Sequence, residues 1–477
     1  MLTFDAQPAL GEAQAIAREM RIVRAARDRG PGTETAAHEH DLAVLQERLD
    51  ALLEDPATGP AIREALDARA SILRTAVHAR RAEVRRAEQR ERAERVVAAA
   101  AGAGRDLTRS ERDRVGQLRD GQREHGAATR DWRAGITTAA ERDGVLEALG
   151  ALRLREAREQ LRHGLLLTGQ MRQIIAEALP AVLRGEPVLL VGETGGAKTA
   201  LAEHLSRHGA GLEPELVSGY GDITSAQMLG AHELRAEHGA TTSVFVPGPL
   251  LRALTEGRPV ILDEINAMPA EFLKRLNRIL QLRPGDDFGV QEDVGRRVRV
   301  AEGFAIIATA NEQTPHRYRG LDRLSAELVN RFGANGYRVH YPDAGVRFED
   351  FPAENGLLAA AAVADAHGRL PSTVSVDEIV RVARAAFISQ QVFSGAHGAG
   401  FGDYVGTEQE IDGRPGLEES VLAPRTLVAV LQKVAGSAGA VTLDRALGRF
   451  VESVMHREDR RVLGLILEGQ GFSLASR

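Results

Sequence analysis

The 477-residue sequence predicts an α/β core built on a parallel sheet flanked by helices, with one α-helical region before it and another after it. In the middle of the chain, short apolar runs alternate with stretches of helical periodicity, which is the pattern of βαβ units. Before residue 165 the chain has mixed charges, helical spacing and very few aromatic residues. After about residue 343 the pattern becomes helical again, with helices expected at 354–367, 376–389, 424–435 and 443–457. We therefore divide the chain into residues 1–164, 165–343 and 344–477.

Composition excludes several classes of protein. Cysteine is absent, which excludes disulfides, Cys-ligated zinc and thiol catalysis and favours a reducing compartment, so we expect a cytoplasmic location. The net charge of −6 gives no global basic field for nucleic acid, although a local basic patch stays compatible with it. No run approaches the roughly 20 apolar residues of a membrane span. Lysine occurs only three times, at Lys198, Lys274 and Lys433.

The first 164 residues are expected to form long helices with coiled-coil-like packing. A leucine seam recurs at steps of three and four, at Leu42, Leu45, Leu49 and Leu52. After a Pro/Gly break at 56–60, a long Ala/Arg/Glu helix should end near Gly102 and Gly104. Further helices are expected at about 108–123 and 138–162. A partner-binding helical hairpin and a mere packing appendage both fit this pattern.

The strongest functional motif follows the apolar run at 187–191, a candidate central strand like the runs at 259–262 and 304–309. It is a glycine-rich turn that leads into a helix, made by Gly192, Glu193, Thr194, Gly195, Gly196, Ala197, Lys198, Thr199 and Ala200. In such a turn backbone N–H groups cradle phosphates, the lysine reaches the β and γ phosphates of ATP, and the Thr199 hydroxyl binds Mg²⁺. Ala197 departs from the motif, which has glycine there. Its methyl would either crowd the phosphates or be tolerated at an already helical position.

An acidic pair, Asp263 and Glu264, closes the apolar run at 259–262. A carboxylate at the end of the strand beside the P-loop can hold a metal through water, and a second one can polarise the attacking water. We therefore expect Asp263 to serve Mg²⁺ and Glu264 to act as the general base.

Together these motifs resemble the AAA+ ATPases, within them the group with an insert in the second helix, which includes MoxR-type, midasin-type (dynein-related) and McrB-type proteins. The narrower likeness is carried by Gly-Glu-Thr-Gly at 192–195, Phe-Val-Pro-Gly-Pro-Leu at 245–250 and Leu-Asp-Glu-Ile-Asn at 262–266. The resemblance begins near residue 165 and implies a P-loop NTPase core with a C-terminal all-α lid. It also implies an insert at about 225–246 and a hairpin at about 285–300. The lid would contain the Gly-rich loop 395–416.

The resemblance assigns two further catalytic positions. Asn311, after the run at 304–309, matches sensor 1, whose polar side chain orients the lytic water. Arg331 matches the arginine finger, which stabilises charge on the γ phosphate held by a neighbouring subunit, with Arg319 and Arg323 as nearby competitors. The plainer interpretations are a strand-end turn residue and a surface arginine.

The resemblance also assigns two binding positions, of which the match at Gln170 is the shorter. Arg425 opens a helix in the lid and matches sensor 2, while Gln170 resembles the segment that borders the adenine. Among other polar signals, His204 and His208 lie four apart at the end of the P-loop helix, but the sequence offers no evident third metal ligand.

The resemblance implies an ATP-hydrolysing homo-oligomer, a hexameric ring, that remodels a protein partner in the manner of a chaperone. MoxR-type relatives often act on proteins with von Willebrand factor A domains, so such a client fits by analogy. Two alternatives stay open. One is an McrB-type nucleotide-driven motor that works with DNA and a nuclease partner. The other is an ATP-binding switch or scaffold with little turnover, which Ala197 favours and the intact Asp263, Glu264 and Asn311 oppose.

Overall fold

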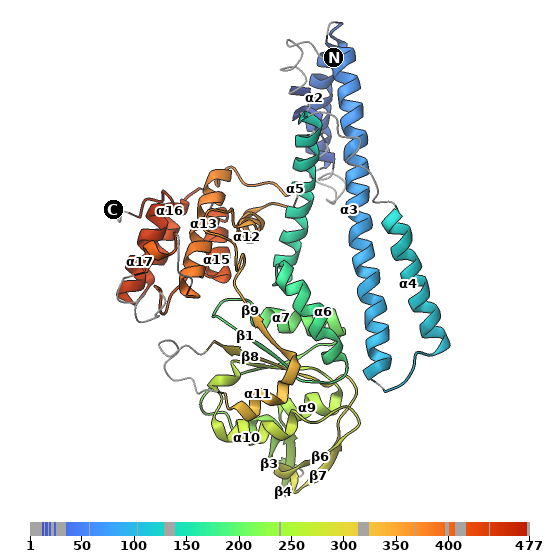
Figure 1. Ribbon diagram of the computed structural model, residues 1–477, viewed down its shortest axis with the longest axis vertical. Helices are drawn as coiled ribbons and strands as arrows, with labels where there is room; N and C mark the ends of the chain where they lie inside the picture. Colours follow the sequence, from blue (N-terminus) through green and yellow to red (C-terminus); the bar gives the residue numbers. More distant parts are fainter. Residues whose placement is uncertain are drawn as a thin grey trace. The chain divides into compact units, whose positions relative to one another are not determined.

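A computed structural model describes residues 12–13, 15–17, 19–20, 23–24, 35–56, 58–102, 104–127, 139–237, 240–312, 324–366, 368–395, 400–405, 416–437 and 439–474. The chain divides into two compact units, residues 1–90 with 117–153 and residues 91–116 with 154–477. Figure 1 labels the helices and strands within each unit. The three-part division expected from the sequence stays a prediction.

Long helices fill the region before the sheet, as the sequence predicts. They are α2 (Thr35–Glu54), α3 (Gly59–Gly102), α4 (Arg109–Ala127) and α5 (Ala139–Arg162). Leu45 of the predicted seam is buried against Ile16 and Met20, and the other seam leucines pack beside it. Gly104 follows α3 with φ +63°, a conformation in which glycine ends helices without steric cost.

A five-stranded parallel sheet forms the core of the second unit. Its strand order is β2-β5-β8-β1-β9. The strands are β1 (Val188–Gly192), β2 (Glu215–Ser218), β5 (Val260–Asp263), β8 (Ile306–Asn311) and β9 (Gly336–Val339). The three apolar runs predicted as central strands are therefore confirmed, and they are adjacent as β5, β8 and β1. Because all strands run the same way, their carboxyl ends lie along one edge.

Both faces of this sheet are covered by helices. Val188 and Leu190 pack with α6 (Gly169–Leu183) and α7 (Lys198–His204), whereas Leu189 packs with helices on the other face. Those helices are α9 (Pro249–Glu256), α10 (Ala270–Ile279) and α11 (Ala326–Phe332). Side chains alternate between the two faces of a strand, so a continuous apolar run is what a strand buried on both faces requires. The predicted P-loop helix continues past α7 as a π-helix, η3 (Leu205–Ala210).

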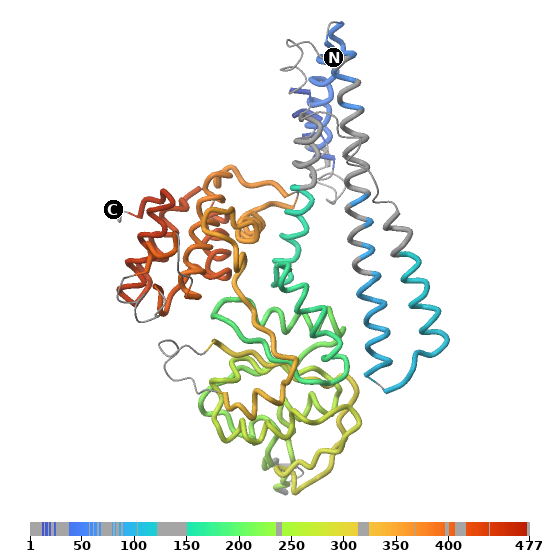
Figure 2. The backbone as a smooth tube through the Cα atoms, viewed as in Figure 1, coloured from blue at the N-terminus to red at the C-terminus, as the bar shows by residue number. Residues whose placement is uncertain are grey.

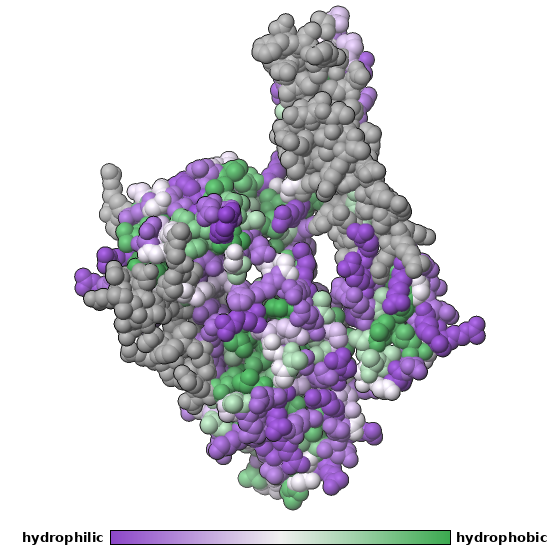
Figure 3. Space-filling model, in the orientation of Figure 1, coloured by the Kyte–Doolittle hydropathy of each residue, from purple (hydrophilic) through white to green (hydrophobic). Residues whose placement is uncertain are grey.

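Two antiparallel hairpins occupy the segments where the sequence suggests an insert and a second hairpin. After the short helix α8 (Ser225–Leu229), β3 (Gly230–Glu237) pairs with β4 (Ala240–Pro247). The other hairpin joins β6 (Asp287–Val290) to β7 (Arg296–Arg299). The hairpins lie side by side, with Nε2 of His232 3.6 Å from a carboxylate oxygen of Asp293. On the face seen in Figure 3, hydrophilic side chains cover much of this end of the unit.

The C-terminal region is helical, as Figure 2 lets the reader follow. Its apolar side chains form a cluster that also includes Ala157 and Leu166. Its longer helices are α12 (Ala353–Val363), α13 (Val376–Phe393), α15 (Pro424–Ala435), α16 (Leu443–Ser453) and α17 (Arg457–Gly469). The sequence predicts one helix over 443–457, but Val454 is extended and divides it. Of the Gly-rich loop 395–416, only residues 395, 400–405 and 416 are described. Among the described residues, no helix combines the length and apolar character needed to cross a membrane.

Candidate functional site

The predicted phosphate loop connects β1 to α7 at the carboxyl edge of the sheet. A side chain at Gly192 would collide with the carbonyl oxygen of Val339 on the neighbouring strand, so the chain needs glycine there. Gly195 has φ +71°, and a Cβ at this position would come within 2.7 Å of the Cβ of Ala423 from the C-terminal helices. The glycines therefore serve both the tight turn and the close approach of the lid.

Ala197 adopts the left-handed conformation, with φ +65° and ψ +25°. It is the residue before the first residue of α7, so the alternative that this position is already helical is wrong. An alanine in this region is strained by about 1 kcal/mol because its Cβ crowds the following carbonyl oxygen. The motif has glycine here for this backbone reason, and the chain tolerates alanine at some cost.

Lys198 is almost fully buried at the start of α7, with 7% of its surface exposed. Its ammonium donates to the carbonyl oxygens of Gly192 (3.0 Å) and Glu193 (2.8 Å) and to Oδ1 of Asn311 (3.0 Å). Burial lowers the pKa of Lys198 to about 8, and the carboxylates of Glu193 and Asp263 counteract this only in part. The lysine thus joins the loop to the end of β8.

The Asp263 carboxylate lies beside the hydroxyl of Thr199, the residue that follows Lys198 in α7. Thr199 donates to Oδ1 of Asp263 at 2.7 Å, and Thr309 of β8 donates to the same oxygen at 2.6 Å. The Thr309 hydroxyl also accepts the backbone N–H of Glu264 at 3.0 Å. A hydroxyl beside a carboxylate is a set of hard oxygen donors of the type that Mg²⁺ prefers.

Glu264 and Asn311 meet at the ends of β5 and β8. The amide Nδ2 of Asn311 lies 3.4 Å from Oε1 of Glu264, whose backbone has φ +53°. A non-glycine residue in this region is strained, and such strain gathers at functional sites. The fully buried Asn266 exchanges bonds with the backbone of Asn311, at 3.3 and 3.4 Å, and so fixes the strand end.

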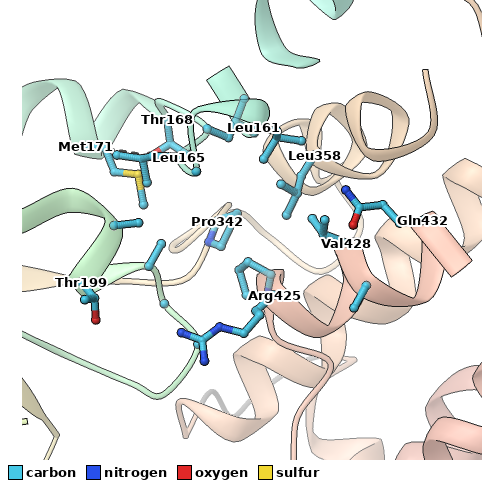
Figure 4. Close-up of a pocket in the computed structure, with 18 residues that line it drawn as sticks. Leu161, Leu165, Thr168, Met171, Thr199, Pro342, Leu358, Arg425, Val428 and Gln432 are labelled. Atoms are coloured by element: carbon cyan, nitrogen blue, oxygen red, sulfur yellow. Dashed lines mark hydrogen bonds between the residues drawn. The ribbon is translucent and has the colours of Figure 1, made fainter. Parts of the chain in front are cut away.

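A pocket of about 340 Å³ opens above the phosphate loop. Figure 4 shows Thr199 and Arg425 at one side, Leu161, Leu165, Thr168 and Met171 along another, and Leu358, Val428 and Gln432 opposite. Loop residues 195–197 complete the lining. The pocket therefore has apolar walls beside a polar end that consists of the loop backbone, a hydroxyl and a guanidinium, which suits a base or sugar joined to phosphates.

The structure brings most of the predicted binding residues together, but it places Gln170 elsewhere. The Gln170 amide bonds to the backbone of β9, at Arg338 and His340, and its neighbours Thr168 and Met171 line the pocket instead. Arg331 does not line the pocket of its own chain. Its half-exposed guanidinium lies 3.3 Å from Glu327. The competitors Arg319 and Arg323 lie outside the described residues.

The two histidines at the end of the P-loop helix and its π-helical continuation lie near a third, His163, which the sequence did not suggest. The rings of His204 and His208 lie 4.8 Å apart, and the ring of His163 lies 6.0 Å from that of His208. Burial, and then the neighbouring His208, lower the pKa of His204 to about 4. In the part of the chain that the structure describes, no group of three or more His, Cys, Asp or Glu side chains is arranged to hold a metal ion.

Several residues of the site are missed by the sequence patterns. Thr309 had a usable signal, because it lies two positions before Asn311 and residues two apart on a strand share a face. Tyr341 donates its hydroxyl to the carbonyl oxygen of Thr194 at 2.6 Å, across 147 residues, which no local pattern reveals. Leu161 lines the pocket although the sequence assigns it to the N-terminal region.

The residues present fit both predicted ligands. The left-handed Gly195 and the N-terminus of α7 provide the backbone turn that phosphates require, with the buried ammonium of Lys198 beside it. Thr199 and Asp263 form the oxygen pair that would hold Mg²⁺. The apolar part of the pocket would suit the base of a nucleotide, whereas a site for phosphate alone does not need apolar walls.

Comparisons with known proteins point to one family. Residues 187–332 match the family described as AAA domain (dynein-related subfamily). The uncharacterized protein YojN of Bacillus subtilis is 34% identical over 159 residues, which cover 33% of this chain and 50% of that protein. The uncharacterized protein YehL of Escherichia coli is 30% identical over 203 residues, 42% of this chain and 52% of that protein. The chain therefore spans about half the length of these bacterial relatives.

A longer relative and two solved structures complete the comparison. Midasin of Giardia intestinalis is 31% identical over 169 residues, which are 35% of this chain and 3% of midasin. Crystal structures of NtrX from Brucella abortus, one of them in complex with ATP, reach TM-scores of 0.33 and 0.31 at 17% and 18% identity. They cover 74% and 69% of this chain and 76% of each NtrX chain, and at this distance they say nothing about the site. By its matched segment and its sequence relatives, the chain contains an AAA domain of the dynein-related type at residues 187–332.

Proposed function

We propose that this chain is an ATPase that converts ATP and water to ADP and phosphate. One observation carries the proposal: residues at the ends of three adjacent parallel strands form a connected hydrogen-bonded group. The group consists of Lys198, Thr199, Asp263, Glu264 and Asn311, with Thr309 joining Asp263 to Glu264. Ligands of open parallel sheets bind outside the carboxyl ends of the strands. The pocket with apolar walls lies beside this group.

The phosphate chain would be held by the loop backbone and by Lys198. Its ammonium is buried, so its charge acts on the phosphates with little screening by water. Thr199 and Asp263 would hold Mg²⁺, which supplies a Lewis acid that neutralises charge on the β and γ phosphates. Arg425, which lines the pocket, would add a second positive charge from the lid.

The attacking water would be activated at Glu264. Its carboxylate takes the proton as the new P–O bond forms, while the Asn311 amide orients the water. Asn311 is suited to this role because its Oδ1 accepts from Lys198 while its Nδ2 faces Glu264. The side chain is therefore held from both sides.

Turnover tests this assignment directly. Glu264→Gln should retain ATP binding and lose at least about 100-fold in kcat, since an amide cannot accept the proton. Glu256→Gln, which changes an exposed acid paired with Arg258, is the matched control and should hydrolyse ATP like the wild type. Equal hydrolysis by wild type and Glu264→Gln would refute the mechanism. A wild type that binds ATP without turnover would instead support a nucleotide-dependent switch, for which the strained Ala197 is the favouring feature.

We further propose a hexameric ring in which Arg331 completes the site of the neighbouring subunit. The proposal is supported by the position of this arginine, which is accessible and outside the pocket of its own chain. Mixing inactive Arg331→Ala chains with inactive Lys198→Ala chains should restore part of the activity, because some interfaces then combine an intact lysine with an intact arginine. No recovery, or a monomer in the presence of a slowly hydrolysed ATP analogue, would contradict the ring. Arg347→Ala, at an exposed ion pair with Asp350, is the matched control.

The partner is proposed to be a protein that the ring remodels, with a von Willebrand factor A domain as one fitting class. The long N-terminal helices offer a surface for recruiting it, and the cytoplasmic location remains a prediction. In the presence of ATP, Glu264→Gln rings should retain the client long enough for its recovery and identification from the native host. Wild-type rings that hydrolyse ATP should release it.

A further inference from the structure

Two side-chain amides form a reciprocal pair inside the lid. Asn355 lies in the first turn of α12 and Gln390 lies near the end of α13, and both are fully buried. Nδ2 of Asn355 donates to Oε1 of Gln390, and Nε2 of Gln390 donates to Oδ1 of Asn355, each at 3.1 Å. Each carboxamide thus both donates to the other and accepts from it, inside the apolar cluster of the lid.

On one side the pair reaches the segment that carries Arg425. Nε2 of Gln390 also donates to the carbonyl oxygen of Leu422 at 2.9 Å. Leu422 precedes Ala423, which approaches the phosphate loop at Gly195, and α15 then presents Arg425 to the pocket. The Gln390 side chain therefore holds the backbone three residues before the guanidinium.

In the other direction, hydrogen bonds connect the pair to the apolar side of the pocket. Nδ2 of Asn355 donates to Oδ2 of Asp343 at 3.0 Å, and the Asp343 carboxylate also accepts the backbone N–H groups of Asn355 and Glu354, at 2.8 and 2.9 Å. Glu354 accepts from the N–H of Asp343 at 3.1 Å and from the N–H of Gly169 at 3.0 Å. Gly169 follows the lining residue Thr168.

These contacts form one unbroken series of direct hydrogen bonds from Gly169 to Leu422. Burying amides is costly unless each donor and acceptor is paired, and two apolar side chains would pack α12 on α13 without that requirement. Apolar contacts tolerate sliding, whereas hydrogen bonds demand a narrow range of distances and angles. A fully paired series therefore fixes the position of the Leu422 backbone more sharply than packing alone.

We propose that the Asn355–Gln390 pair is a positioning element of the nucleotide site, which holds Arg425 in register with the phosphate loop by fixing the carbonyl of Leu422. The proposal rests on the ATPase function proposed above. Neither amide lines the pocket. The pair acts through Arg425, so removing it should matter only while that arginine is present.

A double-mutant cycle tests this dependence. Arg425→Ala, Gln390→Met and the double variant are compared for kcat, KM and the dissociation constant of a fluorescent ADP analogue. Gln390→Met should change the same constants as Arg425→Ala, by about fivefold or more, and should add less than about twofold in the Arg425→Ala background. Ser389→Ala is the matched control, because this buried neighbour on α13 bonds only within its own helix and should leave all constants unchanged.

A merely structural role gives a different result. Losses that multiply in the double variant, or a folded Gln390→Met with wild-type constants, would overturn the proposal. If Gln390→Met does not fold, Gln390→Asn takes its place, since a side chain shorter by one methylene cannot hold both Asn355 and Leu422. If the wild type binds ADP but does not hydrolyse ATP, the proposed ATPase function is refuted. The double-mutant cycle is then judged from the dissociation constants of the ADP analogue alone. Wild type that binds no nucleotide would overturn both proposals.

Discussion

Raising the pH from 7 to 9.5 should weaken ATP binding because Lys198 loses its proton. The ordinary pKa of a lysine lies far above this range, but burial lowers that of Lys198 to about 8 in the nucleotide-free protein. A bound triphosphate places several negative charges beside the ammonium and raises its pKa again. Binding above pH 8 therefore requires the uptake of a proton, which costs free energy as protons become scarce.

The size of the effect follows from the pKa of about 8. The protonated fraction of Lys198 in the free protein falls from about 0.9 at pH 7 to about 0.5 at pH 8 and about 0.03 at pH 9.5. If the pKa in the complex lies above 10, ATP affinity should fall about 30-fold over this range, or about 2 kcal/mol. A lysine with an ordinary pKa would change affinity by less than about 1.2-fold.

Calorimetry in buffers with different ionisation enthalpies measures the proton uptake. We expect about half a proton per ATP at pH 8 and about 0.9 at pH 9, while the γ phosphate, with a pKa near 6, contributes nothing there. Lys274→Ala, at an exposed lysine of α10, should behave like the wild type, whereas Lys198→Ala should bind weakly without proton uptake. A flat affinity between pH 7 and 9.5, or no uptake at pH 8, would refute the reasoning.

The stability of the free protein should change in the opposite direction. Between pH 8 and about 10.4 the unfolded chain binds a proton at Lys198 that the folded chain does not, so the free energy of unfolding rises with pH in this window. Saturating ATP should remove this rise. The two opposite trends assign both effects to one group, because a general alkaline loss of structure would lower stability and affinity together.

Three further predictions concern the site and its supporting helix. Thr309→Val should destabilise the protein by about 2 kcal/mol and lower kcat, because the Glu264 N–H loses its acceptor and Asp263 loses a donor. Urea unfolding measures the loss of stability and an ATPase assay measures kcat; an unchanged kcat would contradict the prediction. Ala197→Gly should raise stability by up to about 1 kcal/mol, since relief of left-handed strain exceeds the added entropy of the unfolded chain; a clear loss in thermal unfolding would argue against strain. As pH falls from 6.5 to 4, protonation of the unfolded chain at His204 should lower stability by about 2 kcal/mol, and a His204→Gln variant with the same acid titration would exclude this cause.

Local patterns predict the elements of this protein well where one rule acts alone. The runs that become β1, β5 and β8 are continuous and apolar because both faces of each strand are buried. The helix expected over 443–457 fails for the opposite reason. Its periodicity continues across Val454, but the chain turns there and begins α17 in a new direction, a choice made by packing in the lid core.

The candidate site shows the same division. Lys198, Asp263, Glu264 and Asn311 can be found from the sequence because each lies at the end of a strand or soon after it, and parallel strands bring their carboxyl ends together. Tyr341, Gln390 and the apolar walls of the pocket have no such rule, since their partners lie 32 to 147 residues away.

By itself, the sequence determined the strand-and-loop chemistry of the phosphate end, because a tight turn, an ammonium and two carboxylates are specified by residue type and short spacing. Only the tertiary structure decided what surrounds it. The burial that lowers the pKa of Lys198 and the amide series that reaches Leu422 both arise from segments distant in sequence. Residue type determines which chemistry a group can perform, whereas burial and the positions of distant partners determine its protonation state and its contacts.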